Sequence, residues 1–361
     1  MEKTEMFSVK SSILVIALVL LTGAGCTDNI SEVPAWQLAD GTAGNSVSAI
    51  SIYQSDPDTV YAYGNGLLES SDAGYKWYSI SKSSLETNIK LPLQVDPLNS
   101  KRLYASDVDG RITTVFSSDY YVTEMSTNRG KTWKILSAGP ASAIRIDPVN
   151  PKSVFIAEES GDILHSVDQG QTWSTIQPPP SISEPELYTL AIDPSNDHIL
   201  YAGYNDGIYK STDQGKSWQK LNLGSTVNSP SLLAVDPQSP ETVYAAVDSS
   251  TKSNYQGGVY KSTDGGKNWQ KMDAGLSAQD RQIRSMTINP KNPDQLFLGL
   301  SGSQAPLCYE STNGGRLWSG FSEGLPDSGA VQSIEINTLN AKIYCGVSGS
   351  SADGVYIRGE R

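Results

Sequence analysis

Apolar and polar residues alternate along most of this chain in short runs that are separated by turn residues. The clearest stretch is residues 187–221, in which the runs LYTLAI, ILYAGY, IYKS and WQKL are divided by polar, glycine-containing or proline-containing segments. A period of two is typical of half-buried β-strands, and Asx, Pro and Gly between the runs favour turns. The pattern therefore predicts four antiparallel strands joined by three hairpins.

The third of these hairpins carries a motif that recurs six times: Ser, any residue, Asp or Asn, any residue, Gly, two further residues and Trp. The Asx side chain bonds backbone groups that follow it, Gly supplies a positive φ, and Trp opens the next strand with a large area to bury. A repeat every 40–56 residues is typical of repeat architectures. We interpret its Asx and Trp residues as structural. They are Asp72, Asn128, Asp168, Asp213, Asp264, Asn313, Trp77, Trp133, Trp173, Trp218, Trp269 and Trp318.

The copies STDQGKSW at 211–218 and STDGGKNW at 262–269 resemble the Asp-box, or BNR, repeat. That repeat occurs in sialidases, sortilin-type receptors, xyloglucanases and photosystem II assembly factors. The resemblance implies a β-propeller in which each box is the hairpin between the third and fourth strands of a blade. It also implies that the box is structural and lies away from the active face.

Six blades align on residues 47–80, 91–136, 142–176, 187–221, 231–272 and 283–321. Residues 331–361 supply three more strands and stop where a box would begin. The start Trp36-Gln37-Leu38 matches the fourth strands that begin at Trp218 and Trp269, so we predict that it completes a seventh blade. Closure removes the exposed edges of an open sheet. The predicted fold is all-β: a seven-bladed β-propeller of four-stranded antiparallel blades, with its ring closed by the N-terminal strand at Trp36.

The first 25 residues have the order of a signal peptide. The apolar run from Ile13 to Leu21 is too short to span a bilayer, and small residues lead to Cys26. The ending Gly-Ala-Gly-Cys is similar to a lipoprotein lipobox, which makes Cys26 the expected first mature, lipid-bearing residue. We therefore predict a signal peptide at 1–25, a linker and closing strand at 26–46, and the propeller at 47–361. An ordinary secreted protein and an uncleaved anchor are the alternatives.

The formal net charge is −12, and no Lys/Arg-rich run is present. This balance argues against nucleic acid as a partner, because little is available to neutralise phosphates. The remaining cysteines, Cys308 and Cys345, are expected on neighbouring blades. Export permits a disulfide between them, and two buried free thiols are the alternative.

The first and third hairpins of a propeller blade share one face, and the second hairpins share the other with the links between blades. The copies are alike on the first face and differ on the second, where loops on a rigid scaffold often bind ligands. Tyr and Arg suit such recognition surfaces, whereas drift of unconstrained loops is the alternative. The candidate binding residues are Asp107, Asp109, Arg111, Tyr120, Tyr121, Tyr204, Asn205, Tyr255, Arg281 and Arg284.

Arg145 and Glu335 occupy equivalent places in strand one of blades three and seven, where the other copies carry small or neutral residues. They either face the central channel or are simply solvated or paired. The neutral residues at this place are Ser51, Gln94, Ala191, Ala234 and Thr287.

Catalytic motifs are mostly lacking. His165 and His198 do not have zinc-ligand spacing, so we expect no metal, and no motif indicates a cofactor. The Arg-Ile-Pro motif of sialidases is missing, because Arg145-Ile146 is followed by Asp147. Glycoside hydrolysis by two carboxylates stays open. The acidic candidates for such a pair are Asp107, Asp109, Glu158, Glu159 and Asp206.

Two hypotheses follow. The first is a non-catalytic binding or assembly scaffold for a protein partner, held outside the cytoplasmic membrane, which is similar to the photosystem II assembly factor group. The second is a glycan-active protein, either a glycoside hydrolase or a lectin-like binder, that uses carboxylates and Tyr residues on the same face.

Overall fold

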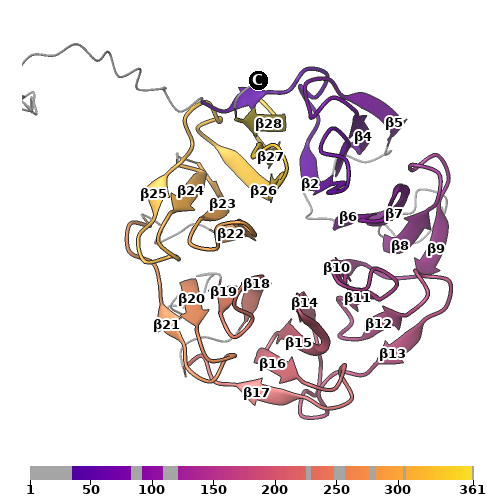
Figure 1. Cartoon of the computed structure of the whole chain (residues 1–361), viewed down its shortest axis with the longest axis vertical. Helices are drawn as coiled ribbons and strands as arrows, with labels where there is room; N and C mark the ends of the chain where they lie inside the picture. Colours follow the sequence, from indigo (N-terminus) through magenta and orange to yellow (C-terminus); the bar gives the residue numbers. More distant parts are fainter. Residues whose placement is uncertain are drawn as a thin grey trace, which may run out of the picture. The chain divides into compact units, whose positions relative to one another are not determined.

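The computed structural model describes residues 35–82, 92–108, 121–224, 229–247, 257–276, 282–303 and 306–359. The chain divides into two units, Met1–Val33 and Pro34–Arg361. The described residues all belong to the second unit, where they form 28 strands and no helix (Figure 1). The predicted all-β fold is confirmed.

The strands pair as five separate four-stranded antiparallel sheets and one eight-stranded sheet, in which β23 and β26 join two further groups of four; these seven groups are described here as blades. Blade one consists of β2(Val47–Ile52), β3(Val60–Gly64), β4(Gly66–Ser70) and β5(Tyr78–Lys82), and blade two of β6(Leu93–Asp96), β7(Asn99–Val108), β8(Tyr121–Ser126) and β9(Lys134–Ser137). Blade three consists of β10(Ala141–Ile146), β11(Val154–Glu158), β12(Ile163–Ser166) and β13(Ser174–Ile176), and blade four of β14(Leu187–Asp193), β15(Asn196–Tyr204), β16(Gly207–Ser211) and β17(Gln219–Leu221). The other three are β18(Pro230–Val235), β19(Val243–Val247), β20(Gly258–Ser262) and β21(Gln270–Lys271); β22(Gln282–Ile288), β23(Leu296–Gly302), β24(Cys308–Ser311) and β25(Ser319–Gly320); and β26(Gly329–Ile336), β27(Ile343–Ser348), β28(Gly354–Arg358) and β1(Gln37–Leu38).

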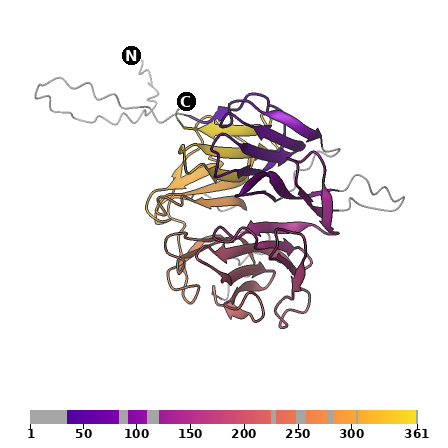
Figure 2. The same cartoon turned by 45° about the vertical axis from the view of Figure 1, so that its right-hand side comes forward.

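The blades form a ring with their first strands innermost (Figure 1). Each first strand contacts the first strand of the next blade, and β26 of blade seven contacts β2 of blade one. In the turned view of Figure 2 the sequence colour passes from blade to blade in chain order. The described residues contain seven hydrophobic clusters, one at each interface between neighbouring blades. The core is therefore divided among the interfaces, so each blade depends on both neighbours.

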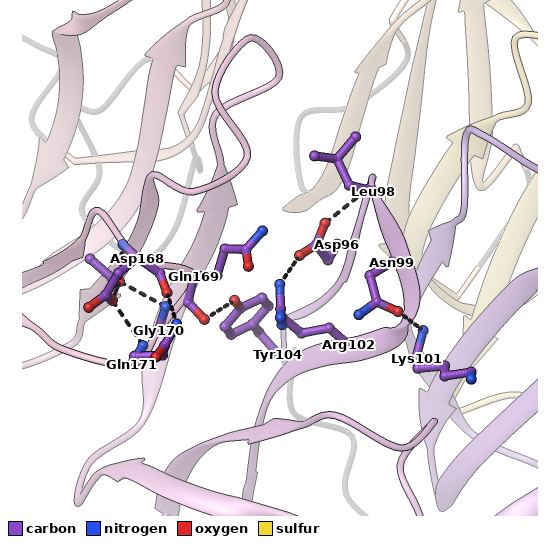
Figure 3. A network of polar contacts seen from close by, with 11 residues as sticks. Asp96, Leu98, Asn99, Lys101, Arg102, Tyr104, Asp168, Gln169, Gly170 and Gln171 are labelled. Atoms are coloured by element: carbon purple, nitrogen blue, oxygen red, sulfur yellow. Dashed lines mark hydrogen bonds and ion pairs between the residues drawn. The ribbon is translucent and has the colours of Figure 1, made fainter.

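A buried aromatic residue stands at the same place in the second strand of every blade. Four of the tyrosines among them bond across the interface, as when the Tyr104 hydroxyl donates to the Gln169 carbonyl at 2.9 Å (Figure 3). The Tyr344 hydroxyl likewise donates to the Ala73 carbonyl at 2.9 Å and links blade seven to blade one. The seven residues are Tyr61, Tyr104, Phe155, Tyr201, Tyr244, Phe297 and Tyr344.

The Asp-box turns are held by a repeated set of short-range hydrogen bonds. In blade four the Gly215 N–H donates to Ser211 Oγ at 2.7 Å, and the Ser217 N–H donates to Asp213 Oδ1 at 2.9 Å. Hydrogen bonds from the Ser217 hydroxyl and, with a smaller effect, from the Ser217 N–H lower the pKa of Asp213 to about 2. The Gln214 N–H donates to the His198 carbonyl in the first hairpin of the same blade. These bonds place both hairpins on one face, here termed the box face.

The N-terminal segment closes the ring. Gln37 and Leu38 in β1 pair with Ile357 and Tyr356 in β28. The Trp36 N–H donates to the Glu323 carbonyl at 2.8 Å, and its indole Nε1 donates to the Phe321 carbonyl at 2.7 Å. Trp318 makes the same two bonds to the preceding blade, to the carbonyls of Ala274 and Met272. Trp36 is thus the tryptophan of blade seven, and the predicted closure is confirmed.

A glycine beside this contact should not tolerate a side chain. Gly324 has a φ of +91°, and a Cβ there would lie 2.2 Å from the Trp36 carbonyl oxygen. Gly324→Ala is therefore expected to lower the free energy of unfolding by about 1–2 kcal/mol, from the left-handed backbone alone, and more if the contact does not relax. Urea unfolding measures this. Gly139→Ala is the matched control, because nothing lies within 4 Å of that added Cβ; equal losses in the two variants would contradict the prediction.

Of the two alternatives for Cys308 and Cys345, the structure has the two free thiols and not the disulfide. Cys308 and Cys345 are fully buried and belong to one hydrophobic cluster between blades six and seven. Burial raises the pKa of each thiol, so neither is an activated nucleophile. Cys26 lies outside the described residues.

Candidate functional site

The first strands of the seven blades surround a cavity of about 130 Å³ at the centre of the ring. Its wall includes Ser48 and Tyr188, which are the second residues of β2 and β14. It also includes Arg145 and Glu335, which are the last residues but one of β10 and β26. All four strands run toward the box face, so the cavity extends along the channel with the two charged residues near its box-face end.

Arg145 and Glu335 occupy one structural position in different blades. In the strand pairing, Arg145 lies opposite Phe155 and Glu335 lies opposite Tyr344. Each therefore faces the buried aromatic residue that stands at the same place in strand two of every blade. The structure therefore places both residues in the wall of the central cavity. The residues paired in the same way in the other blades are Ser51, Gln94, Ala191, Ala234 and Thr287.

The two charges interact without contact. None of the ion pairs in the described residues joins Arg145 to Glu335, and Arg145 Nη1 donates to the carbonyl of its neighbour Ile144 at 2.9 Å. Burial lowers the pKa of Arg145, and the charge of Glu335 opposes that change. Burial also raises the pKa of Glu335 to about 7, against the effect of Arg145. Both groups are therefore held in a cavity that destabilises their charges.

A β-bulge in the first strand points different side chains toward the other end of the channel. The bulged residue is Ser48 in blade one and Ser142 in blade three, and each serine hydroxyl donates to a strand-two carbonyl of its own blade. The equivalent residues are Tyr188, Arg284 and Gln332 in blades four, six and seven. Bulges commonly re-aim side chains next to binding sites. Three blades thus carry a larger side chain in place of a serine that bonds the scaffold.

Tyr188 belongs to a small acidic cluster at this end of the channel. It is 38% exposed, and its hydroxyl donates to Glu186 Oε2. Burial and then this bond raise the pKa of Tyr188 to about 12. Burial raises the pKa of Glu159, and the charge of the nearby Glu186 carboxylate raises it further. The Leu187 N–H donates to the Glu159 carbonyl and fixes the second hairpin of blade three against the link to blade four.

Sequence reasoning missed Glu186 and Tyr188 as site residues. The available signal was the alignment of strand one, in which Tyr188 stands where Ser48, Ser142 and Ser231 stand in other blades. Glu159, Glu186 and Tyr188 lie at the end of the channel opposite the box face. This end, together with the second hairpins and the links between blades, is here termed the second-hairpin face.

The predicted binding residues have different surroundings. Arg284 lies at the strand-one bulge, where its Nε donates to Ser301 Oγ at 3.3 Å and it also bonds Gln282. Asn205 is partly buried, and its Nδ2 donates to the Glu184 carbonyl at 2.8 Å. Tyr121 is partly buried and packs on the cluster between blades one and two.

Tyr204 requires a correction, because its side chain is not on the surface. It is completely buried between blades three and four, and its hydroxyl donates to the Gly161 carbonyl at 3.0 Å. The alternation along β15 turns this residue inward, so its role is packing. The backbone of Asp107 pairs with Val122 in β7 and β8. Asp109, Arg111, Tyr120, Tyr255 and Arg281 lie outside the described residues.

Two other acidic candidates are occupied by scaffold contacts. Lys220 Nζ lies 2.7 Å from Asp206 Oδ2, which also accepts a bond from the Tyr209 hydroxyl. Glu158 accepts a bond from the Ser137 hydroxyl. Of the predicted carboxylates whose side chains the structure describes, Glu159 is therefore the one that lies beside another carboxylate, that of Glu186.

His165 packs and bonds within its own blade. His165 is buried, its ring stacks on Phe155 at 4.1 Å, and burial lowers its pKa. Its Nε2 lies 3.0 Å from Ser153 Oγ within the same blade. In the part of the chain that the structure describes, no three His, Cys, Asp or Glu residues are grouped to hold a metal ion. The same residues include no helix long and apolar enough to cross a membrane.

Comparison with known proteins gives three kinds of similarity. The family model Sortilin-Vps10 (sortilin, neurotensin receptor 3) matches residues 206–350. The xyloglucanase Xgh74A of Acetivibrio thermocellus (strain ATCC 27405) is 34% identical over 164 residues, which are 35% of this chain and 19% of that protein. The chain thus spans less than a fifth of the length of this relative. The resemblance to Asp-box propellers is confirmed.

Solved structures show the same fold at low identity. The GH74 xyloglucanase of Xanthomonas campestris superposes with a TM-score of 0.65 at 16% identity, over 89% of this chain and 53% of that one. A structure described as YCF48 bound to D1 peptide superposes with a TM-score of 0.60 at 14% identity, over 91% of this chain and all of that one. At these identities the similarity establishes the propeller fold alone.

Proposed function

We propose that this Asp-box β-propeller is an exported, membrane-anchored scaffold that binds a protein partner through its second-hairpin face and catalyses no reaction. The observation that carries the proposal is the difference between its two ends. On the box face, Asx side chains and box glycines are used in scaffold hydrogen bonds in blade after blade. At the channel opening of the other face, Tyr188 and Arg284 replace scaffold serines.

These replacements suit a recognition surface. Tyr and Arg combine contact area with polar tips, and both are enriched among residues that dominate binding energies. The chain superposes on the whole length of YCF48 in its structure bound to D1 peptide, which supports a single propeller as a binding unit. The xyloglucanase structure is about twice as long as the aligned region, since 53% of it is covered.

The test is a pull-down from membranes of the source cells with the purified protein. We expect a partner that wild type and Asp213→Asn retain and that Tyr188→Ala and Arg284→Ala each lose. Asp213 is the control because it lies in a box on the opposite face. Loss with Asp213→Asn but not with the other two variants would place binding on the box face and overturn the proposal.

The second candidate function is glycoside hydrolysis, which the Glu159 and Glu186 pair favours. A general acid needs a carboxyl group with a raised pKa beside a second carboxylate, and Glu159 has its pKa raised by burial and by Glu186. The match to a xyloglucanase makes xyloglucan the first substrate to try. Release of reducing sugar that Glu159→Gln and Glu186→Gln each abolish would replace the scaffold proposal with this one. A blank hydrolysis screen would remove it.

Membrane anchoring gives a separate prediction. If Cys26 carries lipid, Cys26→Ser should move the protein from the membrane fraction to the soluble fraction, because the acyl chains supply the membrane affinity. Fractionation with immunoblotting measures this, and mass spectrometry of the wild-type N-terminus identifies the modification. Cys308→Ser is the control, since that thiol is buried in the propeller. Equal fractionation of wild type and Cys26→Ser would contradict a lipid anchor.

A further inference from the structure

The central cavity contains two opposite charges that do not neutralise each other by contact. Arg145 and Glu335 line it from blades three and seven, and the described ion pairs do not include them. Removing a charge from water is costly unless a partner replaces the lost hydrogen bonds. Arg145 uses one donor on the adjacent Ile144 carbonyl, so its other donors remain for a group in the cavity.

Most other polar groups of the wall are used by the scaffold. Among the described wall residues, the Gln94 amide and Gln332 Oε1 are exceptions, because no hydrogen-bond partner is present for either, and Gln94 stands at the same position as Arg145 and Glu335. The wall hydroxyls used in bonds between blades are those of Thr189 with Leu233, Ser285 with Val331, Thr287 with Ile334, and Ser333 with Ile50. Among the described wall residues, the groups left for a ligand thus include one cation, one anion, the Gln94 amide and the Gln332 side-chain oxygen.

The size of the cavity limits the ligand. Its volume is about 130 Å³, and a small organic molecule fits this space. The ligand must also offer a negative group to Arg145 and a positive group to Glu335 from one compact body.

We propose that the central cavity binds a small zwitterion of the α-amino acid class, with its carboxylate on Arg145 and its ammonium on Glu335. The planar guanidinium matches a carboxylate in bidentate geometry, and Gln94 supplies a further donor or acceptor. This site is distinct from the protein-binding role of the second-hairpin face. Each charge of the ligand replaces the partner that the protein itself does not provide.

The test is isothermal titration calorimetry of the purified protein with glycine and L-alanine, beside acetate and ethylamine, which each carry only one of the two charges. We expect saturable binding of at least one amino acid and binding that is at least about tenfold weaker for both analogues, because each lacks one charge-assisted bond. Absence of binding heat from both amino acids at millimolar concentration, or an affinity for acetate equal to that for the amino acid, would overturn the proposal.

Variants locate the site. Arg145→Met and Glu335→Gln should each weaken amino acid binding by about tenfold or more. Arg129→Met is the matched control. Arg129 lies away from the cavity and pairs with Glu69 at a distance of 3.2 Å, so this variant should leave the affinity unchanged. Glu335→Gln keeps the shape of the side chain and removes a buried charge, so it tests the site even if Arg145→Met does not fold. Unchanged affinity in Glu335→Gln would overturn the assignment.

Discussion

Trp36→Ala is expected to lower the free energy of unfolding by about 3–5 kcal/mol, which is the usual loss for a buried aromatic residue cut back to alanine. Trp36 is 3% exposed and lies in the cluster between blades six and seven. Its ring meets Phe321 edge-on at 5.8 Å, and its indole nitrogen donates to the Phe321 carbonyl at 2.7 Å. The substitution therefore removes packing and a bond that hold the N-terminal segment of blade seven against blade six.

Chemical denaturation of wild type and variant measures this loss. Leu38→Ala is the control, because Leu38 stands in the same short strand but is 40% exposed; it should cost less than about 1 kcal/mol. Similar stabilities of wild type and Trp36→Ala would mean that β1 contributes little to the ring.

Removal of residues 27–45 should have a still larger effect than the single substitution. This deletion removes β1 and exposes the edge of β28, and an unpaired edge favours association between molecules. It also removes the bond from the Val355 N–H to Thr42 Oγ1 at 3.1 Å and that from the Trp77 N–H to the Asp40 carbonyl. We expect a lower melting temperature and concentration-dependent aggregation. A truncated protein that melts like the intact one would contradict closure by this segment.

The second large effect is a dependence of stability on pH that comes from Glu335. Its pKa in the folded protein is about 7, above the ordinary value of 4.5. The folded state therefore keeps a proton that the unfolded chain has released, so stability falls as pH rises from about 4.5 to about 7. The difference of about 2.5 between the folded and the ordinary pKa of Glu335 corresponds to about 3 kcal/mol in the free energy of unfolding. In the described residues, Arg145 is the charged group that acts on Glu335.

Urea unfolding at pH values from 5 to 8 measures this dependence. Glu335→Gln should flatten the fall, because glutamine has no proton to release. Arg145→Met should extend the fall above pH 7, because it removes the charge that opposes the rise in the pKa of Glu335. Gln94→Leu is the control, since it changes the same ring of residues without a titratable group. A Glu335→Gln curve parallel to wild type would exclude Glu335 as the source.

The repeat made most of the fold predictable. Each box and each Asx turn is a local structure, because its hydrogen bonds join residues two to four positions apart, as in the bond from Ser195 N to Asp193 Oδ1. Such bonds depend on nearby residue types alone. The closing role of Trp36 followed by counting, since six complete blades and three leftover strands lack one strand that begins with Trp.

The site was less predictable, because it depends on side chains that come together from distant blades. A period of two separates the two sides of a strand but does not say which side faces the core. Tyr204 illustrates this, since it reads as a loop residue beside Asn205 and is completely buried. The β-bulge before Thr189 shifts the register and brings Tyr188 to the channel. Bulges have no strict sequence signature, so this shift is visible only in the structure.

The sequence by itself determined the number of blades, the turns that shape them and the segment that closes the ring, because these depend on local bonding and on repetition. Only the tertiary structure decided that Arg145 and Glu335, 190 positions apart, share one cavity without an ion pair. The curvature of the whole ring sets the distance across the channel. No local pattern encodes that distance, because it is the sum of the packing at all seven interfaces between blades.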